Sequence, residues 1–372
     1  MRNYTKRIAL GVLAGTLCLG TMTGCSEELD GTKTVATVNG EEIPMGIVSF
    51  MARYQQAQTA MMYEQYGLGS TNGMWETVAD EESGETYGEQ AVDQILEQIE
   101  LMYIMRDKAE EYEVTLSEDD QAKIQDAASE FMENNTEETI AEIGVTQEQV
   151  EELLELTTYN DRMYNPIVEE AEIEITDEEA NQSTVTYITV TPEVEEDAEE
   201  ATEEEKAAKK AEAEEMLQQV QSAPEGDMQA VAELVDADNA SATTLSYTSS
   251  GEDETDTVPQ EVIDAVKDLQ DGQVADAVIE GDNAYYVARM DQVLDEEATE
   301  NKKETLTNDK KQEYYTETTE KWMEEAEIEV DEKVKETLTI TDNHSFVFKT
   351  EEAETATGSA VDTATGSAVE AE

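Results

Sequence analysis

Few residues of this sequence have the type and spacing that acid–base or metal chemistry requires. The chain has one histidine, His344, and two cysteines, Cys18 and Cys25, so it cannot supply the Cys/His set of a structural zinc site. It has neither a glycine-rich phosphate loop nor a G-x-S-x-G motif. The hydroxyls of Tyr187 and Tyr286 could bind each other or a substrate carbonyl, although a phenol with a pKa near ~10 differs from an imidazole.

Acidic residues dominate the composition. The 372 residues carry a formal net charge of −70, and 38% of them are hydrophobic. Such a polyanion repels nucleic acid and attracts a basic or unfolded polypeptide. The acidic run at residues 251–256 lacks the ligand order of an EF-hand loop, so we predict a solvated loop there, with no metal and no cofactor. The length predicts roughly two domains.

The first residues have the pattern of a targeting segment. Three basic residues precede an apolar run at residues 8–19 that is too short to span a membrane. The tetrapeptide Met-Thr-Gly-Cys ending at Cys25 resembles a bacterial lipobox. This resemblance implies a lipoprotein signal peptide at residues 1–24, lipidation of Cys25, and a linker at residues 25–34. An ordinary secretory signal with an incidental cysteine is the alternative.

Residues 35–170 are predicted to form a mainly helical domain. The alternating start, VATVNG, predicts a strand and a tight turn. Apolar residues at helical spacing predict a helix over residues 92–105. Capping boxes at Ser117 and Thr146 predict two more helices, and Pro166 is compatible with the end of the second. The segment that begins VATVNGEEIP resembles the N-domain of SurA- and PrsA-like chaperones.

Methionines are concentrated in the first part of this domain. Met45, Met51, Met61 and Met62 lie in or next to the helix predicted after the first turn. Methionine is flexible and polarisable, and promiscuous binding surfaces use it heavily. These four residues are therefore candidates for binding peptides; the alternative is that they fill a helical core.

Residues 171–293 are predicted to form a small antiparallel sheet with helices. The predicted strands are residues 184–191, 274–279 and 284–290, and the predicted helices are 192–221 and 258–269. In order and spacing these elements resemble a parvulin-type peptidyl-prolyl isomerase domain. This resemblance implies a pocket in which two histidines, an acid or cysteine and hydroxyls form a hydrogen-bonded cluster under the substrate proline.

The residues that the resemblance places in the isomerase site differ from those of the family. Tyr187 and Tyr286 stand where the family has histidines, and Thr244 stands where it has an acid. Val262 and Val266 replace the phenylalanines that the family tends to have, so they would form a shallower peptide-binding pocket. We therefore predict an inactive isomerase module; an active peptidyl-prolyl cis-trans isomerase is the alternative.

The remaining residues are predicted to return to the first domain. Residues 294–340 contain a long polar helix and a strand, and the resemblance implies that they pack back on the N-domain with Trp322 as an anchor. The Thr/Ala/Gly/Ser-rich residues 341–372 are predicted to be a disordered tail. The predicted fold is α+β, a mainly helical chaperone domain with an inserted parvulin-like sheet-and-helix domain.

The resemblances imply a function outside the cytoplasm. We expect a lipid-anchored chaperone or foldase on the extracytoplasmic face of a bacterial cell membrane, with unfolded exported polypeptides as partners and no nucleic acid. Besides an active isomerase, a surface scaffold or adhesion lipoprotein that reuses the fold is a second alternative. Suppression of client aggregation distinguishes the chaperone from the scaffold.

Overall fold

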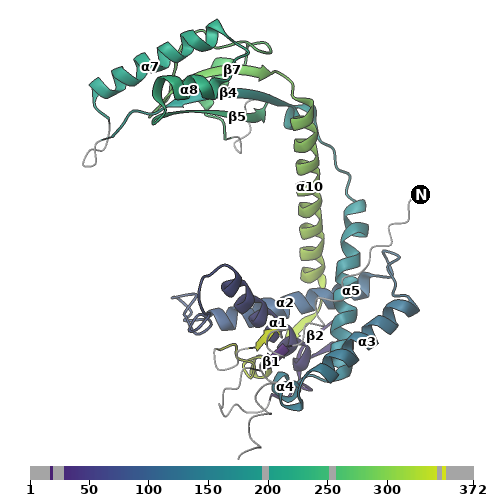
Figure 1. Cartoon of the computed structure of the whole chain (residues 1–372). Coiled ribbons are helices and arrows are strands. Elements are labelled where there is room, and N and C mark those ends of the chain that lie inside the picture. Colours follow the sequence, from purple (N-terminus) through teal and green to yellow (C-terminus); the bar gives the residue numbers. More distant parts are fainter. Residues whose placement is uncertain (1–16, 20–28, 195–200, 251–256, 342–345, 349–372) are drawn as a thin grey trace, which may run out of the picture. The chain divides into compact units, whose positions relative to one another are not determined.

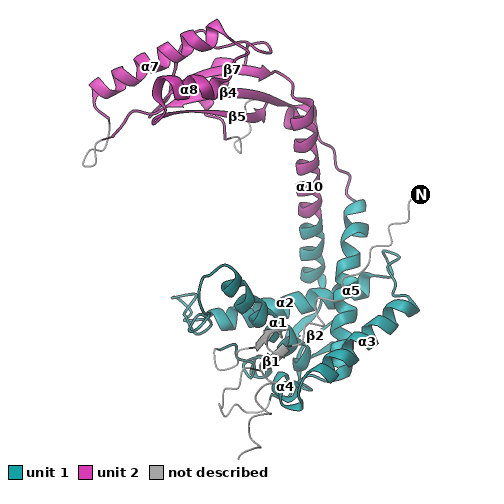
Figure 2. Cartoon of the chain, viewed as in Figure 1, with its two compact units in different colours: residues 1–170, 315–372 teal, residues 171–314 magenta. Residues whose placement is uncertain are grey.

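The chain forms two compact units (Figures 1 and 2). The computed structural model describes residues 17–19, 29–194, 201–250, 257–341 and 346–348. Unit 1 comprises residues 1–170 and 315–372, and unit 2 comprises residues 171–314. Unit 1 is thus built from two stretches of sequence that flank unit 2. Mixed helix and small antiparallel sheets make the fold α+β.

Helices make up most of unit 1. They are α1 (Met45–Gln65), α2 (Tyr87–Lys108), α3 (Glu118–Asn134), α4 (Glu137–Ile143), α5 (Gln147–Glu169) and the short α11 (Glu332–Lys335). The capping boxes predicted at Ser117 and Thr146 are confirmed, because each side chain accepts the backbone N–H three residues ahead while that residue's side chain bonds back.

Pro166 does not end α5, which continues to Glu169. A proline removes one hydrogen bond of the helical ladder but leaves the following turn free to pack. Ile167 and Val168 are both buried, so packing of this last turn offsets the missing hydrogen bond. Pro166 therefore does not mark the end of the helix, although its position in the sequence was compatible with one.

A three-stranded antiparallel sheet joins the two stretches of unit 1. Its strands are β3 (Glu41–Pro44), β2 (Thr34–Val38) and β8 (Ile328–Val330), in that order. Asn39 and Gly40 form the tight turn with φ angles of 53° and 84°, the left-handed conformation that this residue pair favours. The Asn39 N–H donates to the carbonyl of Glu327 at 2.8 Å, so the turn also binds the returning chain.

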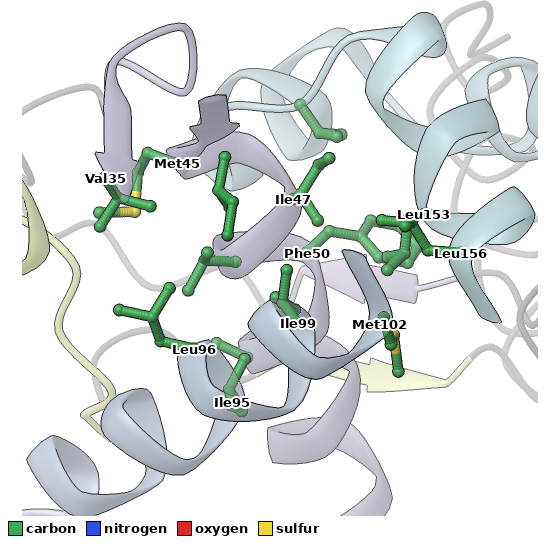
Figure 3. Close-up of a cluster of buried hydrophobic side chains, with 14 of the residues drawn as sticks. Val35, Met45, Ile47, Phe50, Ile95, Leu96, Ile99, Met102, Leu153 and Leu156 are labelled. Carbon is green, nitrogen blue, oxygen red and sulfur yellow. The ribbon is translucent and has the colours of Figure 1, made fainter. Parts of the chain in front are cut away.

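The core of unit 1 lies between the sheet and the helices (Figure 3). Phe50 of α1 and Phe131 of α3 meet edge to face with ring centroids 4.8 Å apart. Met45 and Ile99 lie in the same cluster of buried side chains. Trp322 packs on this cluster and contacts Tyr112 with a ring separation of 5.7 Å, which is the anchoring contact expected for it.

Unit 2 is built on a four-stranded antiparallel sheet. The strand order is β5 (Ala240–Thr248), β4 (Gln182–Val190), β7 (Tyr285–Gln292) and β6 (Ile279–Glu280). Its helices are α6 (Asp177–Ala180), α7 (Glu203–Ser222), α8 (Met228–Asp236) and α9 (Gln260–Val266). Side chains of α7 and α8 pack on one face of the sheet, and those of α9 pack on the other. The strand predicted at residues 274–279 is reduced to β6 and an isolated bridge at Val274.

The long helix α10 (Glu296–Glu325) belongs partly to each unit, as the colour change in Figure 2 shows. The division lies between residues 314 and 315, rather than at the boundary after residue 293 that the sequence suggested. The beginning of α10 is held by unit 2, because the Gln182 N–H donates to the Thr299 hydroxyl at 2.9 Å. Beyond the division, Tyr315 contacts Tyr164 of α5 within unit 1.

The ends of the chain contribute one strand pair to unit 1. Strand β1 (Leu17–Leu19) pairs antiparallel with β9 (Phe346–Phe348). The first lies within the predicted signal peptide, and the second is a strand of three residues within the segment predicted to be a disordered tail. Cys25, His344 and residues 251–256 lie outside the described residues. Within the residues that the structure describes, no helix is long and apolar enough to cross a membrane.

Candidate functional site

Two tyrosines meet on one face of the sheet in unit 2. Tyr187 of β4 is buried and Tyr286 of β7 is half-buried, with ring centroids 5.9 Å apart and ring planes at 80°. The structure thus brings together the two side chains that stand at the histidine positions. A Cβ atom on Gly281 would lie 2.7 Å from the Tyr286 ring, so a larger residue at this hairpin position would have to displace that ring.

The surroundings keep both phenols neutral. Burial raises the pKa of Tyr187, and the neighbouring Tyr286 raises it further. Burial also raises the pKa of Tyr286, with smaller contributions from the negative charges of Glu261 and Asp282. A phenol whose pKa lies above ~10 neither accepts nor releases a proton readily near pH 7. The pair can donate and accept hydrogen bonds, but it is poorly suited to acid–base catalysis.

Val262 and Val266 do not line an open pocket. Both side chains are fully buried under the sheet, in a cluster that includes Tyr187 and Met290. Helix α9 therefore packs on the same face of the sheet as Tyr187. These two valines pack as core residues, and a peptide cannot contact them in this structure.

Thr244 lies on the other face of the sheet. It is paired with Thr186, whereas Tyr187 is paired with Thr243, and neighbouring residues of a strand point to opposite faces. The Thr244 hydroxyl is 2.6 Å from the Thr186 hydroxyl, which donates to Asp291 at 2.5 Å. Thr244 therefore belongs to a hydroxyl ladder and not to the tyrosine pair. Hydroxyl residues two positions apart, Thr184 and Thr186 in β4 and Thr244 and Ser246 in β5, were the sequence signal for this ladder.

The four candidate methionines separate along α1. Met45 is fully buried and Met51 is half-buried against the core of unit 1, whereas Met61 and Met62 are 48% and 45% exposed. The helix continues past the core, and its last two turns lead into a loop with two more exposed apolar residues, Tyr66 and Leu68. We name the four exposed side chains of Met61, Met62, Tyr66 and Leu68 the apolar arm.

A cavity of about 740 Å³ lies in unit 1 at the beginning of α2. Its lining includes the buried Trp75 and the chain at residues 338–341. Six carboxylates also line it, namely those of Glu76, Glu85, Glu89, Asp93, Glu332 and Glu336. We name this cavity the acidic groove. Sequence analysis missed it because its walls come from distant parts of the chain that only the fold brings together.

Comparisons with known proteins leave the chain unassigned. No family model matches it, and no curated protein matches it. Among the solved structures, one that matches is described as belonging to two structurally related SurA-like chaperones of Campylobacter jejuni, the virulence factor PEB4 and the periplasmic protein Cj1289. That match covers 80% of this chain and 98% of the other, with 10% identity and a TM-score of 0.26. A similarity at this level assigns neither a family nor a function.

Proposed function

We propose that this protein is a lipid-anchored extracytoplasmic chaperone that holds unfolded exported polypeptides. The apolar arm is the observation that carries the proposal. Four large apolar side chains, each at least 45% exposed, are close together in the sequence of a strongly acidic protein. Clustered exposed apolar groups mark interaction sites, and methionine adapts to partners of varied shape.

The charge of the protein favours the same class of partner. The net charge of −70 and the carboxylates of the acidic groove attract segments that carry lysine and arginine. They also keep copies of the protein apart, so that the exposed arm does not lead to self-association. Apolar contacts on the arm and ionic contacts at the groove suit unfolded chains that carry both kinds of residue.

Suppression of aggregation tests the chaperone proposal. We expect the full chain to suppress aggregation of reduced, unfolded lysozyme, a basic client, at about equimolar concentration. Replacing both Met61 and Met62 with serine should raise the concentration needed for half-suppression about tenfold, because each half-exposed methionine that the client covers contributes roughly 0.7 kcal/mol.

The variant Leu294→Ser is the matched control. It removes an apolar side chain of similar exposure from unit 2 and should leave the suppression unchanged. If the full chain at equimolar concentration did not delay aggregation, the chaperone proposal would be wrong and a scaffold role would be favoured.

The lipid anchor rests on the lipobox-like sequence before Cys25. We expect the protein, expressed in a bacterium with its first 24 residues, to incorporate a fatty-acid probe and to fractionate with the membrane. The change Cys25→Ala should abolish the labelling, whereas Cys18→Ala should reduce it little, because the apolar run tolerates alanine. Labelling that persists in Cys25→Ala would remove the anchor from the proposal.

The parvulin-like sheet of unit 2 is proposed to be catalytically inactive. Neutral phenols stand in place of the imidazoles, and Val262 and Val266 of α9 pack into the core beside Tyr187 instead of lining an open pocket. In a protease-coupled proline-isomerisation assay, the full chain should give the uncatalysed rate, and Tyr286→Phe should give the same rate. A rate above background that Tyr286→Phe abolishes would instead establish the alternative, an active isomerase.

A further inference from the structure

Strand β5 forms an edge of the sheet in unit 2 (Figure 1). It pairs with β4 over nine residues without a bulge. Its sequence, ASATTLSYT, contains no charged residue, no proline and no glycine. Natural proteins protect edge strands with such residues or with bulges, because an open edge pairs with other chains. The edge of β5 has none of these devices.

The register of the β4–β5 pair shows which backbone groups point away from the sheet. Beyond the two ends of the pair, the Ser249 N–H donates to the backbone carbonyl of Asn181 at 2.7 Å. At the other end, the Thr191 N–H donates to the backbone carbonyl of Asn239 at 3.1 Å. In each case the two residues stand directly opposite each other in this register. Backbone groups alternate in direction along a strand, so the odd-numbered residues of β5 bond to β4 and the even-numbered ones face outward.

The beginning of this edge is covered by α8. The outward N–H of Ala242 donates to the side chain of Gln229 in α8 at 2.8 Å, which confirms the assignment of directions. The next outward N–H groups belong to Thr244 and Ser246, and neither has an acceptor among the residues that the structure describes. The side chain of Thr244 is exposed as well. Among the described residues, β5 thus presents the backbone N–H groups of Thr244 and Ser246 to an incoming strand.

We infer that this edge binds an extended segment of an unfolded polypeptide, which adds a fifth strand beside β5 at Thr244 and Ser246. The inference rests on the proposed chaperone function and supplies a binding mode for it. Main-chain hydrogen bonds at a sheet edge bind segments of varied sequence, which is what a protein with many clients requires.

Charge selects the incoming segment. The exposed Asp238 precedes β5, and the run Gly-Glu-Asp-Glu-Thr-Asp follows it from Gly251 in the sequence. A second copy of this chain, paired antiparallel along the same edge, would bring these acidic flanks together and be repelled. A segment with lysine or arginine beside its β-forming residues is attracted instead. The inferred occupant is therefore a basic extended segment and not a second copy.

Amide hydrogen exchange on the full chain tests the inference. The probe is a ten-residue peptide of alternating lysine and valine, and the comparison peptide has the same sequence with N-methyl groups on the amides of one edge. We expect the first peptide to slow exchange at Thr244 and Ser246 about tenfold or more, while Leu245, already bonded to β4, changes little. The N-methylated peptide should leave exchange at all three positions unchanged.

Two variants separate the backbone from the side chain. Thr244→Pro removes an outward N–H that β4 does not use, so binding of the unmodified peptide should weaken about fivefold or more. Thr244→Val keeps that N–H and should bind as the natural protein does. If Thr244→Pro does not fold, the N-methylated peptide alone decides.

The outcomes distinguish this inference from the proposed function. Peptide binding without slowed exchange at Thr244 and Ser246 overturns the edge inference and leaves the chaperone proposal in place. A dimer in sedimentation that Thr244→Pro abolishes overturns the assigned occupant in favour of a second copy. Failure to bind the peptide overturns the edge inference, and failure to suppress client aggregation separately overturns the chaperone function.

Discussion

Replacing Asp120 with asparagine is expected to lower the free energy of unfolding of unit 1 by about 3 kcal/mol. The Asp120 carboxylate accepts two hydrogen bonds from the guanidinium of Arg162, at 2.7 and 2.9 Å. It also accepts the backbone N–H and the hydroxyl of Ser117, so it closes the capping box of α3. One buried carboxylate thus joins α3 to α5 and caps α3.

Removing the negative charge of Asp120 leaves the positive charge of Arg162 unbalanced in a largely buried place. The Arg162 guanidinium, which is about three-quarters buried, would lose its counter-ion. Hydrogen bonds from Arg162 also hold the pKa of Asp120 well below its usual range. The stability that this carboxylate provides is therefore present above the pKa of the unfolded chain, 3.8, and is lost as the pH falls below it.

Urea unfolding followed by tryptophan fluorescence measures the effect of Asp120→Asn on unit 1. Both tryptophans of the chain, Trp75 and Trp322, lie in that unit, so unit 2 does not contribute. The matched control is Asp119→Asn, which breaks an exposed ion pair with Lys123 and should cost less than about 0.5 kcal/mol. An equal loss of unfolding free energy in the two variants would mean that the Asp120–Arg162 pair stabilises unit 1 no more than an exposed ion pair does.

Replacing Glu100 with glutamine is expected to stabilise unit 1 at pH 8 by up to about 3 kcal/mol more than at pH 4. Glu100 in α2 is 4% exposed, and its Oε1 has no hydrogen-bond partner among the described residues. Burial and, to a smaller extent, the nearby charge of Glu97 raise the pKa of Glu100 to about 7, against the favourable charge of Lys335.

The sign of this effect follows from the two states of Glu100. In the unfolded chain it ionises near pH 4.5, whereas in the folded protein it stays protonated until about pH 7. The favourable contribution of the protonated group is complete below the unfolded pKa and declines as the pH rises to 7. Above pH 7 an ionised carboxylate lies in the core, and the free energy of unfolding is lower by a constant amount.

The same fluorescence measurement at several pH values tests Glu100→Gln. The difference between the variant and the natural protein should grow between pH 4.5 and 7 and then stay constant. The control is Glu97→Gln, at an exposed position one turn away from Glu100. It removes a charge of the same sign, and its effect on the free energy of unfolding should depend much less on pH. A difference for Glu100→Gln that does not change with pH would show that folding leaves the pKa of Glu100 unchanged.

Sequence alone determined the elements whose causes are local. The capping boxes at Ser117 and Thr146 and the turn at Asn39 depend on residues within four positions of each other, so each was identified before the fold was known. The apolar periodicity of α2 likewise identified its core face. The resemblance also placed Tyr187 and Tyr286 in one expected site, and the pairing of β4 with β7 brings their rings into contact.

The tertiary structure decided which of these residues are accessible. Met45 and Met61 are the same residue type on the same helix. Met45 is buried and Met61 is exposed, because α1 extends beyond the core. Thr244 was one register position from the face expected for it, and a shift of one residue reverses the face of the sheet. Glu100 is buried because the fold closes over it, which the periodicity of α2 cannot show. Exposure and register depend on contacts between distant segments, so only the folded chain determines them.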